Sequence, residues 1–282
     1  MDYIEVDFIV QPLMEGRDIL LAELGDLPFE SFEETETGLK GYIPSEKYNE
    51  NELKTLSILN SQEFTIRFTR NLILSQNWNA TWESNFQPVL VEEQCYIRAT
   101  FHEPRPEIPV EIVINPKMSF GTGHHETTYL MIDCMLNIDF QSKQVLDMGC
   151  GTGILAIMAE KRGAEKVKGI DIDDWAYENA KENIELNSCE KIDIQKGTVE
   201  LLKPSQKFDI ILANINKNVL LQDISKYNKH LDVGGALLLS GIYKADKNDI
   251  ITVAQHNGLT FISELEKKDW LLLKFLKKNQ KK

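Results

Sequence analysis

The stretch VLDMGCGTG at residues 145–153 decides the fold of this chain. Its apolar start is typical of a buried strand, and its three alternating glycines lead into ILAIMAEKR, which has the pattern of a helix. A strand that turns through glycines into a helix brings free backbone N–H groups and the positive helix end to one point, and glycine lets a ligand approach the bare backbone. The stretch therefore predicts a site for a nucleotide-like cofactor.

The glycines alone do not identify the cofactor. Residues 151–156 satisfy the loose pattern G-x-G-x-x-G/A, so a nicotinamide-dependent oxidoreductase stays open. Asp147 favours S-adenosylmethionine instead, because a carboxylate at the end of the first strand suits a cationic amino group better than a pyrophosphate. Asp171, eighteen residues past Gly153, could accept hydrogen bonds from both ribose hydroxyls of either cofactor.

From Gln144 onward, strands alternate with helices, which indicates a parallel sheet covered on both faces. Two adjacent strands at the end predict a terminal antiparallel hairpin, and a seven-stranded sheet with one reversed strand is typical of the Rossmann-like methyltransferase fold. The expected strands are 144–148, 166–172, 192–195, 208–213, 236–240, 260–266 and 270–276, and the expected helices are 154–162, 174–187, 218–230 and 247–256.

The front of the chain predicts a small, separate α+β domain over residues 1–72. Its elements follow the order β-α-β-β-α-β, which is the ferredoxin-like arrangement. The expected strands are 4–10, 29–36, 39–44 and 63–69, and the expected helices are 17–27 and 52–60.

A connector over residues 73–92 joins this domain to the expected methyltransferase domain, 93–282. Trp78, Trp82 and Phe86 repeat every four residues, so they share one face of a helix.

A second wall for the cofactor is predicted upstream, where glycine and hydroxyl residues at 115–128 lead into an apolar helix. Thr127 or Thr128 also suits the N-terminal cap of that helix. His124 and His125 do not predict a metal site, because adjacent histidines point in different directions and no further ligand set accompanies them. The four cysteines are far apart in the sequence, so neither zinc nor a disulfide framework is expected.

The strand FDIILA at residues 208–213 predicts the reacting end of the site, because it is followed directly by Asn214. Reacting groups gather at the carboxyl ends of strands in open α/β sheets, and an asparagine can accept from an amine while it donates to a cofactor. Residues 215–217 read Ile-Asn-Lys rather than Pro-Pro-aromatic, which disfavours an adenine or glutamine-amide target.

These motifs together resemble the bacterial methyltransferases of large-subunit ribosomal protein eleven. The run F-G-T-G-x-H at residues 120–125 is much more specific than the glycine loop. The resemblance implies an S-adenosylmethionine-dependent enzyme that methylates lysine ε-amino and N-terminal α-amino groups of that ribosomal protein, and whose N-terminal domain recognises this substrate. By position, it puts cofactor contacts on Thr128, Gly149, Asp171 and Asn214. Further candidates for the cofactor site are Asp147, Gly151, Gly153, Phe120, Gly121, Thr122, His124 and Thr127.

Charge and composition fit this expectation. Residues 1–72 hold fifteen acidic and six basic side chains, a net charge of −9, which should repel nucleic acid and attract a basic protein. The acidic start and the lack of a roughly 20-residue apolar stretch predict a cytoplasmic protein without a membrane span, and we expect a monomer. A methyltransferase of another protein or of a small molecule, and a cofactor-binding module without turnover, stay open as alternatives.

Overall fold

The computed structural model describes residues 2–73, 86–117 and 119–278. The chain divides into two compact units, Met1–Asn85 and Phe86–Lys282, and each is described by itself. Trp78 and Trp82 of the expected connector helix lie outside the described residues. Within the described parts, no helix has the length and apolar composition that a bilayer span requires.

The first unit is the predicted ferredoxin-like domain. Its sheet has the order β2-β3-β1-β4, and every neighbouring pair is antiparallel. The strands are β1 (Tyr3–Gln11), β2 (Ser31–Glu34), β3 (Gly38–Pro44) and β4 (Thr65–Ile73), and the helices are α1 (Leu13–Leu24) and α2 (Glu50–Lys54).

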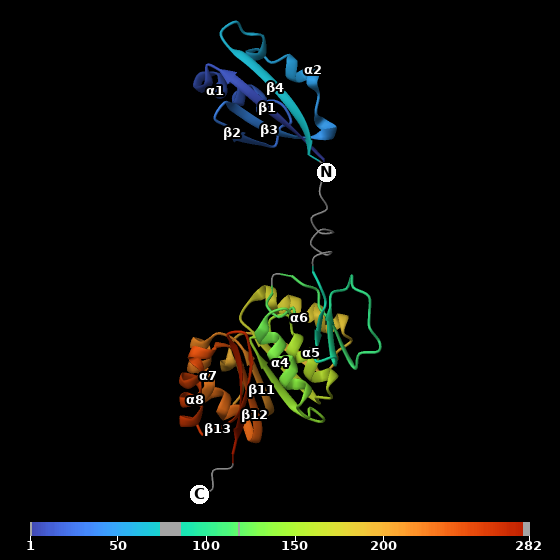
Figure 1. The fold of residues 1–282 in the computed structure, drawn as a ribbon, viewed down its shortest axis with the longest axis vertical. Helices are drawn as coiled ribbons and strands as arrows, with labels where there is room; N and C mark the ends of the chain where they lie inside the picture. The colour runs from blue at the N-terminus through green and yellow to red at the C-terminus, as the bar shows by residue number, and fades with distance from the viewer. Residues whose placement is uncertain (1, 74–85, 118, 279–282) are drawn as a thin grey trace. The chain divides into compact units, whose positions relative to one another are not determined.

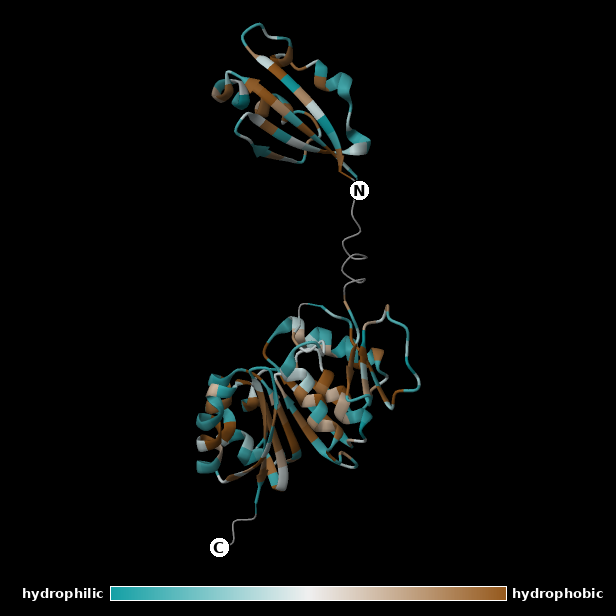
Figure 2. Cartoon of the chain, viewed as in Figure 1, coloured by the Kyte–Doolittle hydropathy of each residue, from teal (hydrophilic) through white to brown (hydrophobic). Residues whose placement is uncertain are grey.

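The alternation of apolar residues in the first strand explains the core of this unit. Val6, Phe8 and Val10 are at most 1% exposed and pack with Leu20 and Leu24 of α1. Successive side chains of a strand point to opposite faces, so one face of β1 lies in the core and the other carries polar groups. Figure 2 shows this alternation of hydrophobic and hydrophilic residues along the strands.

The single helix predicted over residues 52–60 is wrong. The structure has α2 at Glu50–Lys54 and a separate 3-10 turn at Ile58–Asn60. Helix α2 ends where the Thr55 hydroxyl donates to the carbonyl oxygen of Glu52 (2.6 Å). The Glu23 carboxylate then accepts from the Ser57 hydroxyl and from the backbone N–H of Ile58 (3.2 Å), which offers this backbone a partner outside a helix.

The second unit contains the predicted seven-stranded sheet, with the order β10-β9-β8-β11-β12-β14-β13. Strand β14 runs antiparallel to both of its neighbours, and the other pairs are parallel. The strands are β8 (Gln144–Met148), β9 (Lys166–Asp171), β10 (Ile192–Lys196), β11 (Phe208–Asn214), β12 (Leu231–Tyr243), β13 (Leu259–Lys267) and β14 (Trp270–Lys277), and the helices are α4 (Glu126–Leu136), α5 (Ile154–Lys161), α6 (Asp174–Leu186), α7 (Lys217–His230) and α8 (Lys247–His256).

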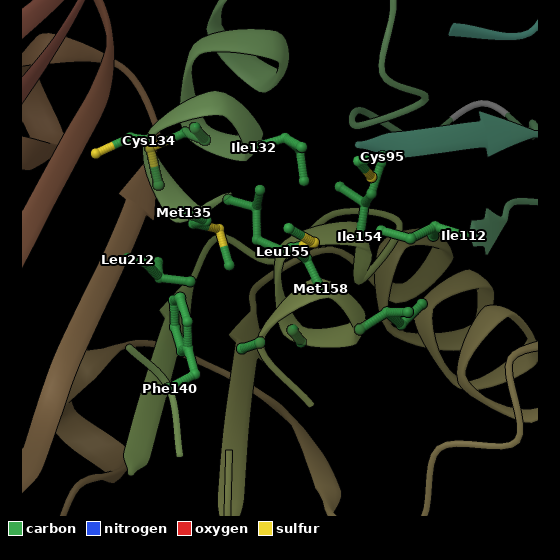
Figure 3. Packing of buried hydrophobic residues seen from close by; sticks show 14 of the residues in the cluster. Cys95, Ile112, Ile132, Cys134, Met135, Phe140, Ile154, Leu155, Met158 and Leu212 are labelled. Carbon is green, nitrogen blue, oxygen red and sulfur yellow. The ribbon is translucent and has the colours of Figure 1, made fainter. Parts of the chain in front are cut away.

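Helices cover both faces of this sheet, as Figure 1 shows. On one face, α4 and α5 pack against the strands around buried Met135, Phe140 and Leu155 (Figure 3). On the other face, α7 and α8 bury a second cluster that includes Tyr227 and Ile250. The strands are apolar on both faces because both are covered, as expected of a parallel sheet.

A small three-stranded sheet in the second unit was not predicted. It consists of β5 (Val89–Val91), β6 (Cys95–Arg98) and β7 (Val110–Val113), in that order. The expected connector, 73–92, therefore overlaps the start of the second unit. Phe86 packs there as well, with its ring centroid 4.5 Å from that of His124. Strands of three or four residues carry too little periodicity to be recognised in a sequence.

Candidate cofactor and amine site

A cavity of about 520 Å³ opens at the carboxyl ends of β8, β9 and β11. Among the residues that line it are Phe120, Gly149, Gly151, Asp171 and Asn214, which the sequence predicted from four separate segments. Its volume lies in the range of about 300–1,000 Å³ that is usual for cofactor sites. The fold thus brings together the glycine loop, the Phe120 segment, Asp171 as the predicted ribose acceptor, and Asn214 at the predicted reacting end.

The glycine loop has a conformation that other residues adopt only with strain. Gly149 and Gly151 have φ of +66° and +55°. A Cβ at Gly149 would lie 2.3 Å from Ile215 Cγ2, and a Cβ at Gly151 would lie 2.3 Å from the carbonyl oxygen of Phe120. Side chains are excluded at both positions, so bare backbone faces the cavity.

The predicted second wall is attached directly to this loop. The Thr152 hydroxyl donates to the carbonyl oxygen of Gly121 (2.6 Å). The backbone N–H of Thr152 donates to the carbonyl oxygen of Phe120 (2.9 Å). Gly121 has φ of +106°. These bonds hold the Phe120 segment beside the glycine loop, and the Phe120 ring is left 51% exposed at the cavity.

Asp171 lies at the end of β9 and lines the cavity. Its Oδ2 accepts from the backbone N–H of Gly151 (2.9 Å), and its Oδ1 accepts from that of Asp173 (3.0 Å). A carboxylate has about four lone-pair sites, so two sites remain for the hydroxyls of a ligand. The two backbone bonds fix the direction in which those sites point.

The side chain of Asp147 lies in a different place from the one that the sequence predicted. Its carboxylate is completely buried behind the loop and does not line the cavity, so it does not face the amino group of a cofactor as predicted. Its Oδ2 accepts from the backbone N–H of Ala156 (3.1 Å), which ties the first turn of α5 to β8. Burial raises the pKa of Asp147 to about 7. The sequence showed the position of this residue on the strand but not the depth of its side chain.

Four polar atoms of residues on the cavity wall are buried and have no hydrogen bond within the described residues: Asn214 Oδ1, Ser119 Oγ, Asp223 Oδ1 and Tyr227 Oη. Of these, Asp223 Oδ1 forms an ion pair with Lys226 (2.8 Å). Buried polar groups are normally paired, so unpaired ones on a cavity wall fit a site that a polar ligand completes. Asn214 is held in place by its neighbours: Ile215 packs against Gly149, and Asn216 Oδ1 caps α7 by accepting from the backbone N–H of Val219 (3.1 Å).

Five other predicted residues lie off the wall of the cavity: Gly121, Thr122, His124, Thr127 and Gly153. Gly153 has φ of +78° and begins α5. His124 points elsewhere, with its Nε2 2.7 Å from the carbonyl oxygen of Gln87 and its Nδ1 3.2 Å from the Thr122 hydroxyl.

The residue that caps α4 is His125, and not Thr127 or Thr128. Its side chain accepts from the backbone N–H of Thr127, and its Nδ1 lies 2.8 Å from the Thr127 hydroxyl. Thr128 also lies off the cavity wall, but its Oγ1 is buried and has no hydrogen bond among the described residues. No group of three or more potential metal ligands occurs in the described parts of the chain.

Known proteins share this combination of motifs and fold. Residues 11–278 match the family described as Ribosomal protein L11 methyltransferase (PrmA). A relative of that name from Phocaeicola vulgatus is 42% identical over 99% of this chain and 100% of its own length. Another from Porphyromonas gingivalis is 44% identical over 93% of this chain and 91% of its own length. The chain belongs to the ribosomal protein L11 methyltransferase family.

The fold agrees with a solved structure from the same family. A crystal structure of ribosomal protein L11 methylase from Lactobacillus delbrueckii subsp. bulgaricus has a TM-score of 0.63 and 28% identity to this chain, and covers 69% of this chain and 99% of that one. The predicted fold class, a Rossmann-like methyltransferase domain with a small α+β domain in front, is confirmed.

Several residues of this family member line the cavity without having been predicted. Ile172 and Trp175 follow Asp171 and are 69% and 77% exposed. Asp223 and Tyr227 line it from α7. A signal was available for Ile172, because it comes directly after the end of β9, whereas Trp175 lies in the first turn of α6. The second pair shares a helical face with Val219, but nothing in the sequence shows that this face borders a cofactor cavity.

Proposed function

We propose that this chain transfers methyl groups from S-adenosylmethionine to lysine ε-amino and N-terminal α-amino groups of ribosomal protein L11. The observation that carries the proposal is the cavity at the carboxyl ends of β8, β9 and β11, where unpaired Asn214 Oδ1 and bare glycine backbone face the same space. Membership of the L11 methyltransferase family supplies the reaction and the substrate.

The cofactor would be held by residues of three strand ends. Asp171 would accept from the ribose hydroxyls, and Gly149 and Gly151 would let the cofactor lie against the backbone. The family resemblance assigns a cofactor contact to Thr128 as well; its Oγ1 lacks a partner among the described residues, and Thr128 lies off the cavity wall. Asp147 would act through the loop by fixing the start of α5. When bound, S-adenosylmethionine supplies an electrophilic methyl group.

The amine to be methylated would lie beside Asn214. A lysine has an ordinary pKa of about 10.4, so it must lose a proton before its nitrogen can attack. A dry pocket disfavours the charged form and lowers that pKa, and the Oδ1 atom of Asn214 would accept from the neutral amine and direct its lone pair. In this proposal the enzyme acts mainly by alignment and desolvation, and the proton leaves to solvent before transfer.

The N-terminal unit would recognise the substrate. Its net charge of −9 over residues 1–72 attracts a basic protein and steers it toward the enzyme. Exposed acidic residues such as Glu15 and Asp18 lie on α1, on the solvent side of the domain. The recognition domain proposed here comprises residues 1–72 and therefore ends before the second unit, which begins at Phe86.

The test is intact-mass measurement of purified ribosomal protein L11 incubated with the enzyme and S-adenosylmethionine. Mass increases in steps of one methyl group, located by fragmentation on lysine side chains or the N-terminal amine, are the expected result. Calorimetric titration with S-adenosylhomocysteine and with NAD tests the cofactor independently. Binding of NAD alone, or methylation of other proteins but not of L11, would contradict the proposal.

A further inference from the structure

Helix α6 carries three asparagines at intervals of four residues. They are Asn179 and Asn183, which are 2% and 0% exposed, and Asn187, which follows the last residue of the helix as its C-terminal cap. Side chains at this spacing lie on one face of a helix. Asparagine favours a helix less than alanine or leucine does, and burial of an amide is costly unless the amide is hydrogen-bonded. Helix formation and apolar packing therefore do not explain these three residues, which are called the asparagine row below.

Two members of the asparagine row bind the backbone that leads from β7 toward the Phe120 segment. Asn187 Oδ1 accepts from the backbone N–H of Val113 (2.9 Å), and Asn187 Nδ2 donates to the carbonyl oxygen of Val113 (2.6 Å). Asn179 Nδ2 donates to the carbonyl oxygen of Asn115 (3.2 Å). Strand β7 lies at an edge of its sheet, so side chains of α6 rather than a further strand bind this part of the backbone.

Asn183 binds two segments that are far apart in the sequence. Its Oδ1 accepts from the backbone N–H of Asn115 (2.8 Å), and its Nδ2 donates to the carbonyl oxygen of Thr152 (2.9 Å). An N–H partner requires the amide oxygen and a carbonyl partner requires the amide nitrogen, so these two bonds determine the orientation of the amide. Asn183 thus connects the beginning of the predicted second wall with the glycine loop.

Thr152 binds the second wall at another point. It is completely buried, and its hydroxyl and backbone N–H donate to the carbonyl oxygens of Gly121 and Phe120. Phe120 and Gly151, the neighbour of Thr152, line the cofactor cavity, whereas Thr152 and Asn183 do not. These two buried residues therefore hold a corner of the cavity wall from behind.

We propose that Asn183 and Thr152 are positioning residues for S-adenosylmethionine, which keep the glycine loop and the Phe120 segment in the arrangement that binds the cofactor. The inference rests on the proposed function, which places the cofactor in this cavity. Without the Asn183 amide, the buried carbonyl oxygen of Thr152 loses this hydrogen bond, and a buried acceptor without a partner is costly. The loop is then less fixed in the free protein, and the cofactor must order it on binding, which lowers the affinity.

Asn183→Ala tests the proposal, and Asn187→Ala is its matched control. Both variants remove an asparagine of the same row, but of the two only Asn183 binds the glycine loop. Urea denaturation should show a lower free energy of unfolding for both variants. In calorimetric titration with S-adenosylhomocysteine, Asn183→Ala should weaken binding at least about fivefold, and Asn187→Ala should change it by less than about twofold.

Thr152→Val and Thr152→Ser test the other contact without a change in α6. Valine lacks the hydroxyl that donates to Gly121, whereas serine keeps it. Thr152→Val should weaken S-adenosylhomocysteine binding at least about fivefold, and Thr152→Ser should stay within about twofold of the wild type. In steady-state assays, Thr152→Val should raise KM for S-adenosylmethionine and leave kcat and KM for ribosomal protein L11 unchanged.

The outcomes separate this inference from the proposed function. Affinities of Asn183→Ala and Thr152→Val within about twofold of the wild type would overturn the inference, and so would equal weakening in Asn183→Ala and Asn187→Ala. If Asn183→Ala does not fold, the two Thr152 variants decide. A wild-type protein that does not bind S-adenosylhomocysteine would instead refute the proposed function.

Discussion

Replacing Gly149 by alanine should disable the cofactor site through one identified contact. The new Cβ would lie 2.3 Å from Ile215 Cγ2, far inside the separation that two carbon atoms tolerate. Ile215 is the residue next to Asn214, so the contact cannot be relieved without moving the side chains that line the reacting end. The backbone at Gly149 also has φ of +66°, which alanine adopts only with strain.

The two costs can be separated. A non-glycine residue in the left-handed region costs roughly 1–2 kcal/mol. Overpacking a side chain into a filled space costs typically about 1–3 kcal/mol more. Gly234 provides the control for strain alone, since it has φ of +86° and a Cβ there would meet no atom within 4 Å. We expect Gly149→Ala to lower the free energy of unfolding by about 2–5 kcal/mol and Gly234→Ala by about 1–2 kcal/mol.

Urea denaturation measures both free energies, and calorimetry with S-adenosylhomocysteine measures affinity. Gly149→Ala should weaken binding at least about tenfold, the equivalent of about 1.4 kcal/mol, whereas Gly234→Ala should leave it unchanged. Adding Ile215→Ala to Gly149→Ala removes the contacted methyl group and should restore part of the lost stability, as a double-mutant cycle would show. Equal destabilisation of the two glycine variants, together with equal affinity for the ligand, would contradict this prediction.

Three further predictions concern charged groups. Asp171→Ala should weaken S-adenosylhomocysteine binding by about tenfold or more in calorimetry, because the two ribose hydroxyls would lose the acceptor proposed for them. Asp174→Ala, on the exposed first turn of α6, should leave the affinity unchanged. The pKa of Asp147 is raised to about 7 by burial, so the folded protein holds this proton more tightly than the unfolded chain; its contribution to stability is fully present below about pH 4 and is lost as the pH rises to about 7. Denaturation should therefore be measured for Asp147→Asn and for the wild type between about pH 5 and pH 8. The free energy of unfolding of the variant minus that of the wild type should rise by roughly 1.4 kcal/mol per pH unit up to about pH 7. A difference that stays constant with pH would contradict this prediction. Neutralising Glu15 and Asp18 to amides should raise KM for ribosomal protein L11 about two- to fivefold at low salt with kcat unchanged, and equal KM values in steady-state assays would argue against recognition by this face.

The sequence by itself determined the type and order of the helices and strands of the seven-stranded sheet domain from β8 onward. Helical and strand periodicities are local, so strands such as β8 and helices such as α8 were predicted at their observed bounds. The glycine loop could be predicted for the same reason, because the positive φ of Gly149 and Gly151 is a local property of the backbone that favours glycine. Asp171 and Asn214 were found because parallel strands end at one edge of the sheet.

Only the tertiary structure decided which polar groups face the cavity and which lie behind its wall. Asp147 and Asp171 both occur near strand ends, yet one is completely buried behind the loop and the other lines the site. The direction of a side chain depends on what packs around it, and Asp223 and Tyr227 reach the cavity only because α7 lies against this part of the sheet. Likewise, the helix predicted over residues 52–60 is interrupted where Ser57 donates to the carboxylate of Glu23, which lies 34 residues earlier in the chain. Contacts between residues far apart in the chain leave no periodic signal, because they exist only once the chain has folded.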